Sequence, residues 1–325
     1  MKWYTPLKLM IHSFLASLSI LLVLLFITSA YSDLISPEKQ ILFAYLGLAF
    51  PALLFVNIFF LAYWVITKRW LFTFTIIVAF IICWKSLLVF CPINSKTDIL
   101  PQNDIIKVLS YNVMSFAYID HKKDSPNKII NYIAESDADI VCLQEYMVSS
   151  RNNLMNSGDV AKALPMYPYI SEIFFSEAKN NRYKYGLAVL SKFPITNSRR
   201  IKFPSVYNGA SIHEINVHGK KIIVVNNHLE SFKLTAEDRS KYSEIITHAN
   251  LESFDDLRGS IQQKLGQAFK IRARQAEIIA DEIQKANGYY TIVCGDFNDT
   301  PISYARRTIK GNLKEIGRAS CRERV

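Results

Sequence analysis

The first ninety residues contain three long segments that are almost free of charged side chains. Residues 9–31 and 41–67 carry none, and residues 71–90 carry only Lys85. A helix of about 20 apolar residues is long enough to cross the ~30 Å hydrocarbon layer of a membrane. The sequence therefore predicts three transmembrane helices within residues 1–91, and it excludes a single soluble globule.

The few charges of this segment predict its orientation. Lys2 and Lys8 precede the first span, and Lys68 and Arg69 join the second span to the third. The loop at 32–40 has one Lys against two acidic residues. Basic residues concentrate on the cytoplasmic side of spans. We therefore expect a multi-pass protein of the inner (cytoplasmic) membrane, with its N-terminus inside and everything after the third span outside the cytoplasm.

Two features of the spans have ordinary explanations. A secretory signal peptide also places Lys before an apolar run, but the run at 9–31 is too long and two more spans follow it. Lys85 lies near the end of the third span, from where its side chain can reach the membrane interface. We assign no function to either feature.

Residues 105–314 alternate between apolar runs and polar segments, and residues 92–104 form a linker in this interpretation. Short runs rich in β-branched residues and followed by polar residues predict largely buried strands. These runs are 105–112, 138–145, 185–191, 210–216, 221–228 and 290–298.

Helices are expected between these strands. Ser125 precedes an amphipathic stretch at 126–136 and is the expected cap of a helix there. Residues 236–286 predict two helices, the second of which, at 262–286, is strongly amphipathic. Strands that alternate with helices around an apolar sheet indicate a layered α/β domain.

The cysteines allow two interpretations. Cys142 and Cys294 both lie inside strand-like apolar runs, and a disulfide between them is possible outside the cytoplasm. Two small buried thiols are the more common arrangement, and we favour it. The chain has no CxxC spacing of the kind that binds zinc.

Several predicted strands end in residues that are used in divalent-metal phosphate chemistry: Asn112, Glu145, His228, and the pair Asp296 and Asn298. Mg²⁺ prefers a few carboxylate oxygens and keeps positions open for water and phosphate, so Glu145 and Asp296 are expected to share one ion with Asn112. Asn and His side chains would donate hydrogen bonds to phosphoryl oxygens as negative charge develops. Neighbouring strands would hold such side chains at fixed separations.

Each of these residues taken singly has a simpler interpretation, such as a turn cap after a strand or a solvated carboxylate. Their occurrence together at strand ends favours a site. The other histidines have no such context, and we expect them to be surface or structural residues. They are His121, His213, His218 and His248.

At this point the soluble part resembles the endonuclease/exonuclease/phosphatase superfamily, which has the deoxyribonuclease-I-like fold. The resemblance rests on five motifs in order along the chain: LSYNV (109–113), DIVCLQE (139–145), YGLAVLSKFPI (185–195), NNHLES (226–231) and GDFNDTP (295–301).

This resemblance implies a four-layer α/β/β/α sandwich after the three transmembrane helices. It also implies cleavage of phosphoester bonds by an activated water, with Mg²⁺, or Mn²⁺ in its place, as cofactor. Glu145 is similar to the family's metal carboxylate, with Asn112 as its companion. His228 resembles the phosphate-polarising histidine, which in some members is the acid toward the leaving group. Asp296 and Asn298 resemble the pair that positions the nucleophilic water and the phosphate.

The end of the chain departs from the family pattern. Members continue with a strand that carries an Asp and then a Ser-Asp-His motif, and nothing in residues 302–325 matches either. Residues 315–325 resemble the translation of a sequencing-library adapter. We therefore expect the domain at 105–314 to be incomplete and the native chain to continue, with an apolar sheet edge exposed in the form given. Resequencing of the gene tests this expectation.

The substrate class stays open at this stage. Residues 92–314 carry 29 basic against 24 acidic residues, a modest excess that suits a phosphodiester or phosphomonoester in nucleic acid or in a lipid headgroup. The segment 226–231 lacks the Tyr-x-Pro-Asn form of abasic-site endonucleases. An anchored nuclease or general phosphodiesterase is one reading, a lipid-directed enzyme similar to sphingomyelinases is the second, and a non-catalytic membrane protein is the third. The lipid bilayer is an expected partner, and no protein partner is predicted.

Overall fold

The computed structural model describes residues 4–92, 105–118, 127–149, 155–177, 183–203, 205, 207–232, 251–286 and 289–315. The chain divides into two compact units, which we call the helical unit and the sandwich unit. Residues 1–96 and 299–325 form the helical unit, and residues 97–298 form the sandwich unit. Most of the predicted linker at 92–104 and nearly all of the tail at 315–325 lie outside the described residues.

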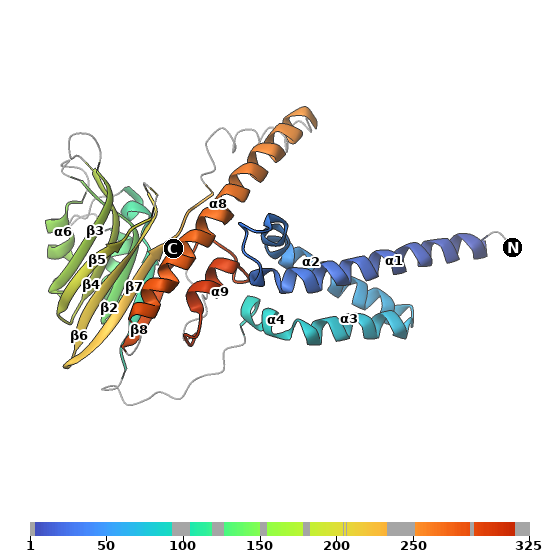
Figure 1. Cartoon of the computed structure of the whole chain (residues 1–325), viewed down its shortest axis with the longest axis horizontal. Coiled ribbons are helices and arrows are strands. Elements are labelled where there is room, and N and C mark those ends of the chain that lie inside the picture. The colour runs from blue at the N-terminus through green and yellow to red at the C-terminus, as the bar shows by residue number, and fades with distance from the viewer. Residues whose placement is uncertain are drawn as a thin grey trace. The chain divides into compact units, whose positions relative to one another are not determined.

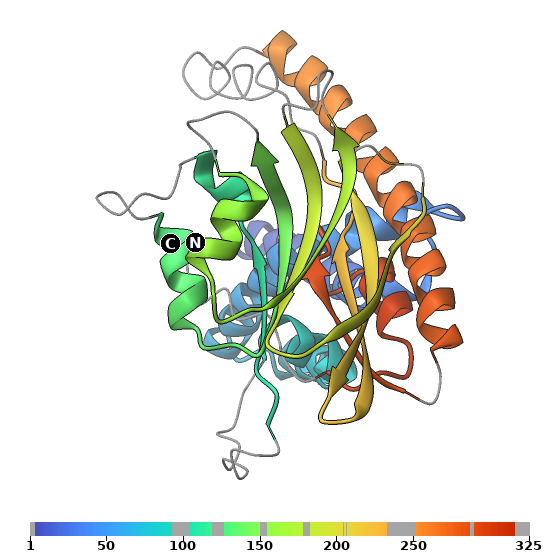
Figure 2. The same cartoon turned by 90° about the vertical axis from the view of Figure 1, so that its left-hand side faces the viewer.

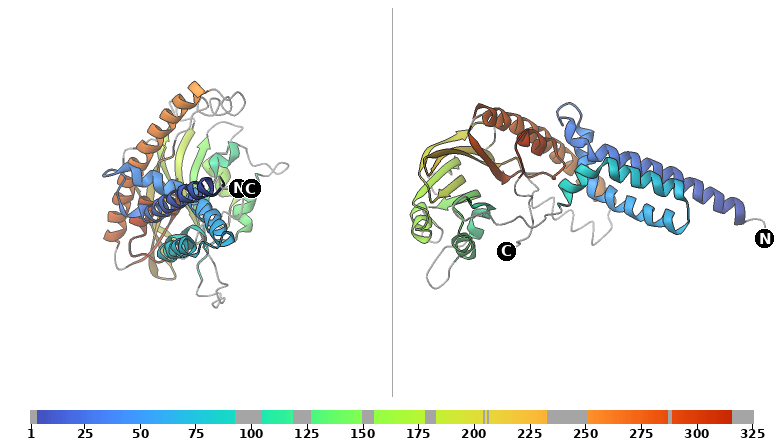
Figure 3. Two further views of the ribbon diagram at one scale, coloured as in Figure 1. Left: turned by 90° about the vertical axis from the view of Figure 1, so that its right-hand side faces the viewer. Right: turned by 90° about the horizontal axis from the view of Figure 1, so that it is seen from below.

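The helical unit begins with apolar helices that lie alongside one another (Figures 1 and 3). They are α1 (Tyr4–Ala30), α2 (Ile41–Ile66), α3 (Trp70–Ile82) and α4 (Trp84–Phe90). Among the described residues, α1 and α2 are each long and apolar enough to cross a membrane, and α3 with α4 makes a third span if the pair is counted together. The predicted apolar N-terminal helices are therefore confirmed, and the third of the three expected spans is present only if α3 and α4 are counted as one span.

The third predicted span is not one straight helix. It bends by 67° between α3 and α4, at Cys83. The hydroxyl of Tyr31 donates a hydrogen bond of 2.7 Å to the carbonyl of Ile82, and Ser86 donates one of 2.6 Å to the carbonyl of Ala30. A helix end leaves unpaired carbonyls, so the Tyr31 bond stabilises the end of α3 at this point.

The spans are joined by close packing and by a few polar contacts. The ring of Phe26 stacks on Phe50 at 5.3 Å between centroids. The indole nitrogen of Trp64 donates to Ser19 over 3.1 Å, and the amide of Asn57 donates to the carbonyl of Leu22 over 3.3 Å. These two donors thus have partners inside the unit, which lowers the free-energy cost of placing them in an apolar environment.

A short C-terminal segment also belongs to the helical unit. Helix α9 (Tyr304–Lys310) contacts the 3₁₀ turn η1 (Ser32–Leu34), which joins α1 to α2. Ile302 is buried in the same apolar cluster as the spans. Arg307 Nη1 lies 3.3 Å from a carboxylate oxygen of Asp33.

The sandwich unit is built on two four-stranded sheets (Figure 2). The first has the order β1-β2-β4-β3 and the second the order β5-β6-β7-β8. In each sheet one pair is parallel, β1 with β2 and β7 with β8, and the other pairings are antiparallel. The strands are β1 (Val108–Asn112), β2 (Ile140–Ser149), β3 (Tyr169–Glu177), β4 (Tyr183–Ser191), β5 (Ile195–Ile201), β6 (Gly209–Val217), β7 (Lys220–His228) and β8 (Tyr290–Asp296).

The two sheets face each other and helices cover their outer sides. Alternate side chains of β2, such as Ile140 and Cys142, enter an apolar cluster with residues of β6 and β7 between the sheets. The intervening ones, such as Val141 and Leu143, pack against α5 (Lys128–Glu135) and α6 (Ser157–Ala163). Helix α8 (Leu251–Lys285) runs along the outer face of the second sheet (Figure 2). This arrangement is the predicted α/β/β/α layering.

The six strand-like runs of the sequence all form strands, and β3 and β5 were not predicted. The cap of α5 is Asn127, whose side chain accepts from the Ile129 N–H, whereas Ser125 lies outside the described residues. Helix α8 is continuous from Leu251 to Lys285, so the expected helix boundary before 262 is wrong. Residues 236–250 of that predicted helical region are not described.

Candidate functional site

The predicted site residues lie at one edge of the sandwich because of the strand directions. Asn112 ends β1, His228 ends β7 and Asp296 ends β8. The parallel pairing aligns Asn112 with Gln144 of β2, and His228 with Asp296. Parallel neighbours end on the same side of a sheet, so each sheet presents its polar end residues at one edge.

Glu145 lies within β2 and is turned toward this edge by a bulge. Leu143 pairs with Ala188 and Tyr146 pairs with Gly186, so two residues of β2 stand opposite a single residue of β4. Leu143 and Tyr146 both enter the outer cluster, and the extra residue between them breaks the usual alternation. Glu145 has a positive φ of 51°. The bulge therefore turns the Glu145 carboxylate away from Leu143 and Tyr146.

Asn112 connects the two carboxylates of the site. Its amide nitrogen donates to Glu145 Oε1 over 3.0 Å and to Asp296 Oδ2 over 2.9 Å. Its amide oxygen accepts from the backbone N–H of Met114 over 3.0 Å. A carboxylate from each sheet thus converges on one point, although the sequence separates them by 151 positions.

His228 completes this cluster. Its Nε2 lies 3.7 Å from Glu145 Oε1, and the residue is 3% exposed. Burial lowers the pKa of His228, while the charges of Asp296 and Glu145 oppose that shift. The ring is therefore neutral near pH 7. Nε2 has no hydrogen-bond partner among the described residues, so it is free to bind a ligand atom.

The loop after β8 is fixed by hydrogen bonds to the end of β7. Asp296 Oδ1 accepts from the backbone N–H of Asn298 over 2.9 Å, and Asn298 has a positive φ of 49°. The side-chain amide of Asn298 donates to the carbonyl of Leu229 over 2.9 Å. The structure thus brings Asn298 beside the cluster, where its amide nitrogen holds the chain that follows His228.

A buried polar pair lies directly behind the site and was not found from the sequence. Gln144 Nε2 donates to Asn226 Oδ1 over 2.6 Å, which joins the two sheets. Asn226 also donates to the carbonyls of Leu143 and Ala188 over 3.1 and 3.3 Å. The available signal was the presence of Gln and Asn at the ends of apolar runs, one residue before Glu145 and two residues before His228.

The donor set fits a hard divalent cation. The described residues contain no group of three or more His, Cys, Asp and Glu side chains placed to hold a metal. Glu145 and Asp296 offer two carboxylates, and in the described part of the chain neither forms an ion pair with Lys or Arg. One or two carboxylates with open positions for water and phosphate is the usual protein contribution to Mg²⁺ binding.

The remaining predicted residues lie elsewhere. His213 is fully buried on β6 and bonds to the hydroxyls of Ser198 and Ser211, and the ring of His218 packs edge-on against Phe193. His121 and His248 lie outside the described residues. Cys142 and Cys294 are free thiols that contact each other between the sheets.

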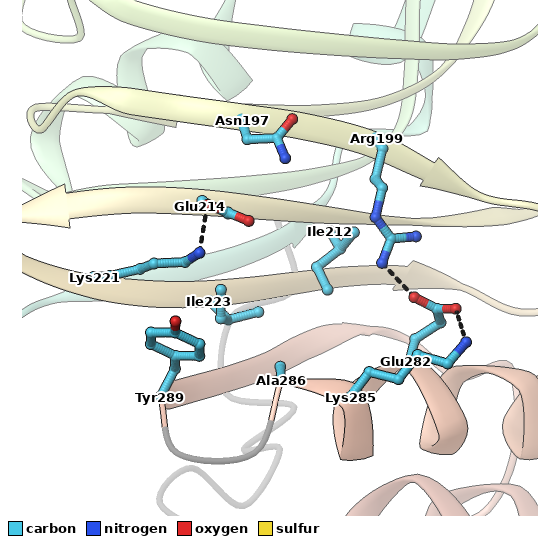
Figure 4. Close-up of a pocket in the computed structure, with 10 residues that line it drawn as sticks. All are labelled: Asn197, Arg199, Ile212, Glu214, Lys221, Ile223, Glu282, Lys285, Ala286 and Tyr289. Atoms are coloured by element: carbon cyan, nitrogen blue, oxygen red, sulfur yellow. Dashed lines mark hydrogen bonds and ion pairs between the residues drawn. The ribbon is translucent and has the colours of Figure 1, made fainter.

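A hollow of about 160 Å³ lies between α8 and the outer face of the second sheet (Figure 4). Its cations are already paired: Arg199 and Lys285 both contact Glu282, and Lys221 contacts Glu214. Lys221 is at the start of β7, at the opposite end of the strand from His228. The ion pair between Arg199 and Glu282 therefore joins the sheet to α8. Among the described residues that line the hollow, no cation is left unpaired for an anionic ligand.

Two family models match the chain. The model described as the Endonuclease/Exonuclease/phosphatase family matches residues 109–322. A domain of unknown function, DUF8431, matches residues 12–90. No curated protein matches the chain.

Solved structures also resemble part of the chain. Sphingomyelinase C from Streptomyces griseocarneus has 19% identity and a TM-score of 0.41, over 64% of this chain and 69% of that one. A humanized D. rerio TDP2 has 17% identity and a TM-score of 0.35, over 59% and 62%. An endonuclease/exonuclease/phosphatase from Beutenbergia cavernae has 13% identity and a TM-score of 0.41, over 63% and 52%.

Proposed function

Because the chain belongs to the endonuclease/exonuclease/phosphatase family, we propose that it is a Mg²⁺-dependent phosphoester hydrolase, with Mn²⁺ as the alternative ion. The observation that carries the proposal is the convergence of Glu145 and Asp296 on the amide nitrogen of Asn112, with His228 beside them. A non-catalytic membrane protein has no physical need to hold two uncompensated carboxylates together.

Each residue of the site has a role that its side-chain chemistry suits. Glu145 and Asp296 hold the cation, with Asn112 as their companion. When bound, Mg²⁺ polarises a phosphoryl oxygen and lowers the pKa of a bound water. Neutral His228 donates a hydrogen bond from its unpartnered Nε2 to a phosphoryl oxygen on which negative charge develops. Asp296 and Asn298 orient the attacking water and the phosphate.

Hydrolysis of a chromogenic phosphodiester by the detergent-solubilised chain tests this function. We expect turnover with Mg²⁺ and none with EDTA. Glu145→Gln and His228→Ala should each lower kcat by about 100-fold or more, the usual effect of removing a preorganised electrostatic group. Glu135→Gln removes an exposed carboxylate at the end of α5 and should leave turnover unchanged. Undiminished hydrolysis in Glu145→Gln or His228→Ala would remove the basis of the assignment.

Contacts inside the helical unit support display of the sandwich unit outside the cytoplasm. Helix α9 contacts η1, so it lies on the side of the membrane where α1 ends. The sequence from 92 to 303 has no apolar run long enough to cross the membrane, so α9 and the sandwich unit share that side. The chain reaches that side after α2 only if α3 and α4 together make a third crossing. With the N-terminus inside, that side is extracytoplasmic.

Protease treatment of intact cells tests this topology. We expect the sandwich unit to be digested from outside, with the spans protected. Digestion that occurs only after lysis would reverse the orientation. A shortened chain that ends before residue 70 keeps the first two spans and serves as a control for membrane insertion. Its N-terminal fragment should be protected from protease both in intact cells and after lysis.

A further inference from the structure

Two tyrosines stand next to each other near the candidate site. Tyr185 lies on β4, and Tyr207 lies two residues before β6. Their ring centroids are 5.9 Å apart and the ring planes meet at 78°. Tyr207 is 55% exposed and Tyr185 is half-buried, so the pair forms a two-walled corner that is open to solvent.

Both tyrosines are connected to the residues of the site. His228 lies against the backbone of Tyr207, and Asn208, the next residue, donates to the carbonyl of Leu229 over 2.9 Å. Burial and the charges of Glu145 and then Asp296 raise the pKa of the Tyr185 hydroxyl. The two tyrosines therefore lie next to the place where a phosphoryl group would bind. They would contact the organic group that is esterified to that phosphate.

The geometry favours a compact cation as the occupant of this corner. The face of an aromatic ring attracts ammonium groups within about 6 Å of its centre, and quaternary ammonium ions are commonly held between several rings. A nucleic-acid base stacks on one open ring face. In the pair of Tyr185 and Tyr207, the edge of one ring points at the face of the other. That face is therefore partly covered, and a flat base has less room to stack on it.

We infer that Tyr185 and Tyr207 bind an ammonium group carried by the organic part of the phosphoester, as in choline or ethanolamine esters of phosphate. The inference rests on the proposed function, because it takes the phosphoryl group to bind at Glu145, His228 and Asp296. The two tyrosines would select the organic part of the substrate. The carboxylates would bind the cation whichever phosphoester is present.

Calorimetric binding to the detergent-solubilised chain with Mg²⁺ tests the inference without requiring turnover. The probes are inorganic phosphate, phosphocholine, and 3,3-dimethylbutyl phosphate, which has the shape of phosphocholine but no positive charge. We expect phosphocholine to bind about tenfold more tightly than its uncharged analogue, the usual scale of a partly desolvated cation–π contact. Tyr207→Leu should abolish this difference, and Tyr207→Phe should keep it.

Matched variants separate this role from a general effect on folding. Tyr290→Leu removes another exposed tyrosine, at the opposite end of β8 from Asp296, and should leave the preference intact. Inorganic phosphate should bind Tyr207→Leu as tightly as the unmodified chain. A loss of phosphate binding in that variant would show that Tyr207 supports the fold of the site, and it would overturn the specificity role.

The possible failures are distinguishable. Absence of phosphate binding in the presence of Mg²⁺ counts against the proposed function, and the inference fails with it. Equal affinity for phosphocholine and its uncharged analogue overturns the inference alone. Tighter binding of thymidine 5′-phosphate than of phosphocholine, lost in Tyr207→Leu, would replace the ammonium site by a base-stacking site.

A turnover arm identifies the source of the ammonium group. Cleavage of phosphatidylcholine in mixed micelles, without cleavage of glycerophosphocholine, would assign a lipid headgroup. Cleavage of glycerophosphocholine at a similar rate would assign a soluble ester, and either result supports the ammonium site. Cleavage of neither, while a chromogenic diester that lacks an ammonium group is hydrolysed, contradicts it.

Discussion

Glu145 combines the key carboxylate with a backbone conformation that an L-residue seldom adopts. Its φ of 51° lies in the left-handed region, which costs roughly 1–2 kcal/mol for a residue with a Cβ. The strain accompanies the bulge that turns the carboxylate toward Asn112 and His228. Backbone strain of this kind is common at functional sites, where it fixes a side chain in an orientation that regular pairing would not give.

Replacement of Glu145 by glycine should therefore separate stability from function. We expect Glu145→Gly to be more stable than Glu145→Gln by about 1 kcal/mol, because glycine adopts positive φ without strain. Both variants lack the carboxylate, so their difference isolates the backbone term. Thermal unfolding in EDTA measures it. Equal stability of the two variants would show that the bulge stores no strain.

His213 should make the stability of the sandwich unit depend on pH. Burial lowers the pKa of His213 to about 4, from an ordinary value near 6.5. Between these values the unfolded chain binds a proton that the folded chain does not, so stability is complete above pH 6.5 and falls as the pH decreases toward 4. The full loss is about 3 kcal/mol.

The comparison of the unmodified chain with His213→Gln, at pH 7 and at pH 4.5, measures this contribution. Glutamine keeps a neutral hydrogen-bonding group near Ser198 and Ser211 but does not titrate. The loss of stability on acidification should be smaller in the variant. If both proteins lose the same stability, His213 is not the titrating group.

At the scale of secondary-structure elements, the close approach of β7 and β8 depends on glycine. Gly295 has a φ of 137°, and a Cβ at this position would lie 2.0 Å from the carbonyl oxygen of Asn227. Gly219, in the hairpin between β6 and β7, also has a positive φ of 84°, but a Cβ there meets nothing within 4 Å. The two glycines therefore share a backbone requirement and differ in packing.

Alanine substitution of the two glycines should have unequal effects. Gly219→Ala is expected to cost about 1 kcal/mol from backbone strain alone. Gly295→Ala must also separate β7 from β8, so we expect a loss of 3 kcal/mol or more, together with displacement of Asp296. Denaturant unfolding of both variants measures the difference, and similar losses would contradict the close approach.

The pair Gln144 and Asn226 holds the two sheets in register behind the site. Asn226→Ala leaves buried polar groups without their partner, which costs about 1–3 kcal/mol. We expect the loss of kcat to exceed what unfolding explains, because a displacement of about 1 Å at a catalytic site can cost 100-fold. Rates measured at a temperature where the variant is fully folded test this. An unchanged kcat under those conditions would limit the pair to a role in stability.

The strands that could be predicted from the sequence are those that contain a run rich in apolar and β-branched residues. The runs that became β2 and β7 are almost wholly apolar, so their position and their polar ends were evident. Strands β3 and β5 lie at the edges of the described sheets and carry charged residues such as Glu172 and Arg199. Edge strands commonly carry charges, and they therefore give no apolar run.

The candidate site could be predicted in part, because several of its residues follow directly after apolar runs. Asn112, His228 and Asp296 end strand-like apolar runs, and the parallel pairing aligns His228 with Asp296 and Asn112 with Gln144, next to Glu145. The inward turn of Glu145 depends on a bulge, and the bulge depends on how β2 pairs with β4. The contact between Gln144 and Asn226 depends on which sheet faces become opposed. Neither the pairing nor the facing of sheets is encoded in a local pattern.

At the scale of the whole molecule, the contact between α9 and η1 links the end of the chain to the loop between the first two spans. Arg307 and Asp33 form an ion pair there at 3.3 Å. A surface ion pair of this kind adds at most about 1 kcal/mol to the free energy of unfolding. The pair is informative here because it shows that the two segments are close together. Only segments on the same side of a membrane can make such a contact.

Cross-linking of Asp33→Cys with Arg307→Cys should therefore succeed in intact cells. We expect a short bifunctional thiol reagent that does not cross membranes to join the two cysteines within one chain. Asp33→Cys alone should give no such product. Cross-linking that requires a membrane-permeant reagent would place both segments inside the cell and would contradict the proposed orientation.

The central claim is that carboxylates from the two sheets hold one divalent cation, and Mn²⁺ binding followed by electron paramagnetic resonance tests it most directly. The detergent-solubilised chain should bind a single Mn²⁺ that Mg²⁺ displaces, and Glu145→Gln and Asp296→Asn should each weaken that binding by at least tenfold. Glu135→Gln should bind as the unmodified chain does. Binding that is absent, or that is insensitive to both Glu145→Gln and Asp296→Asn, would contradict the account.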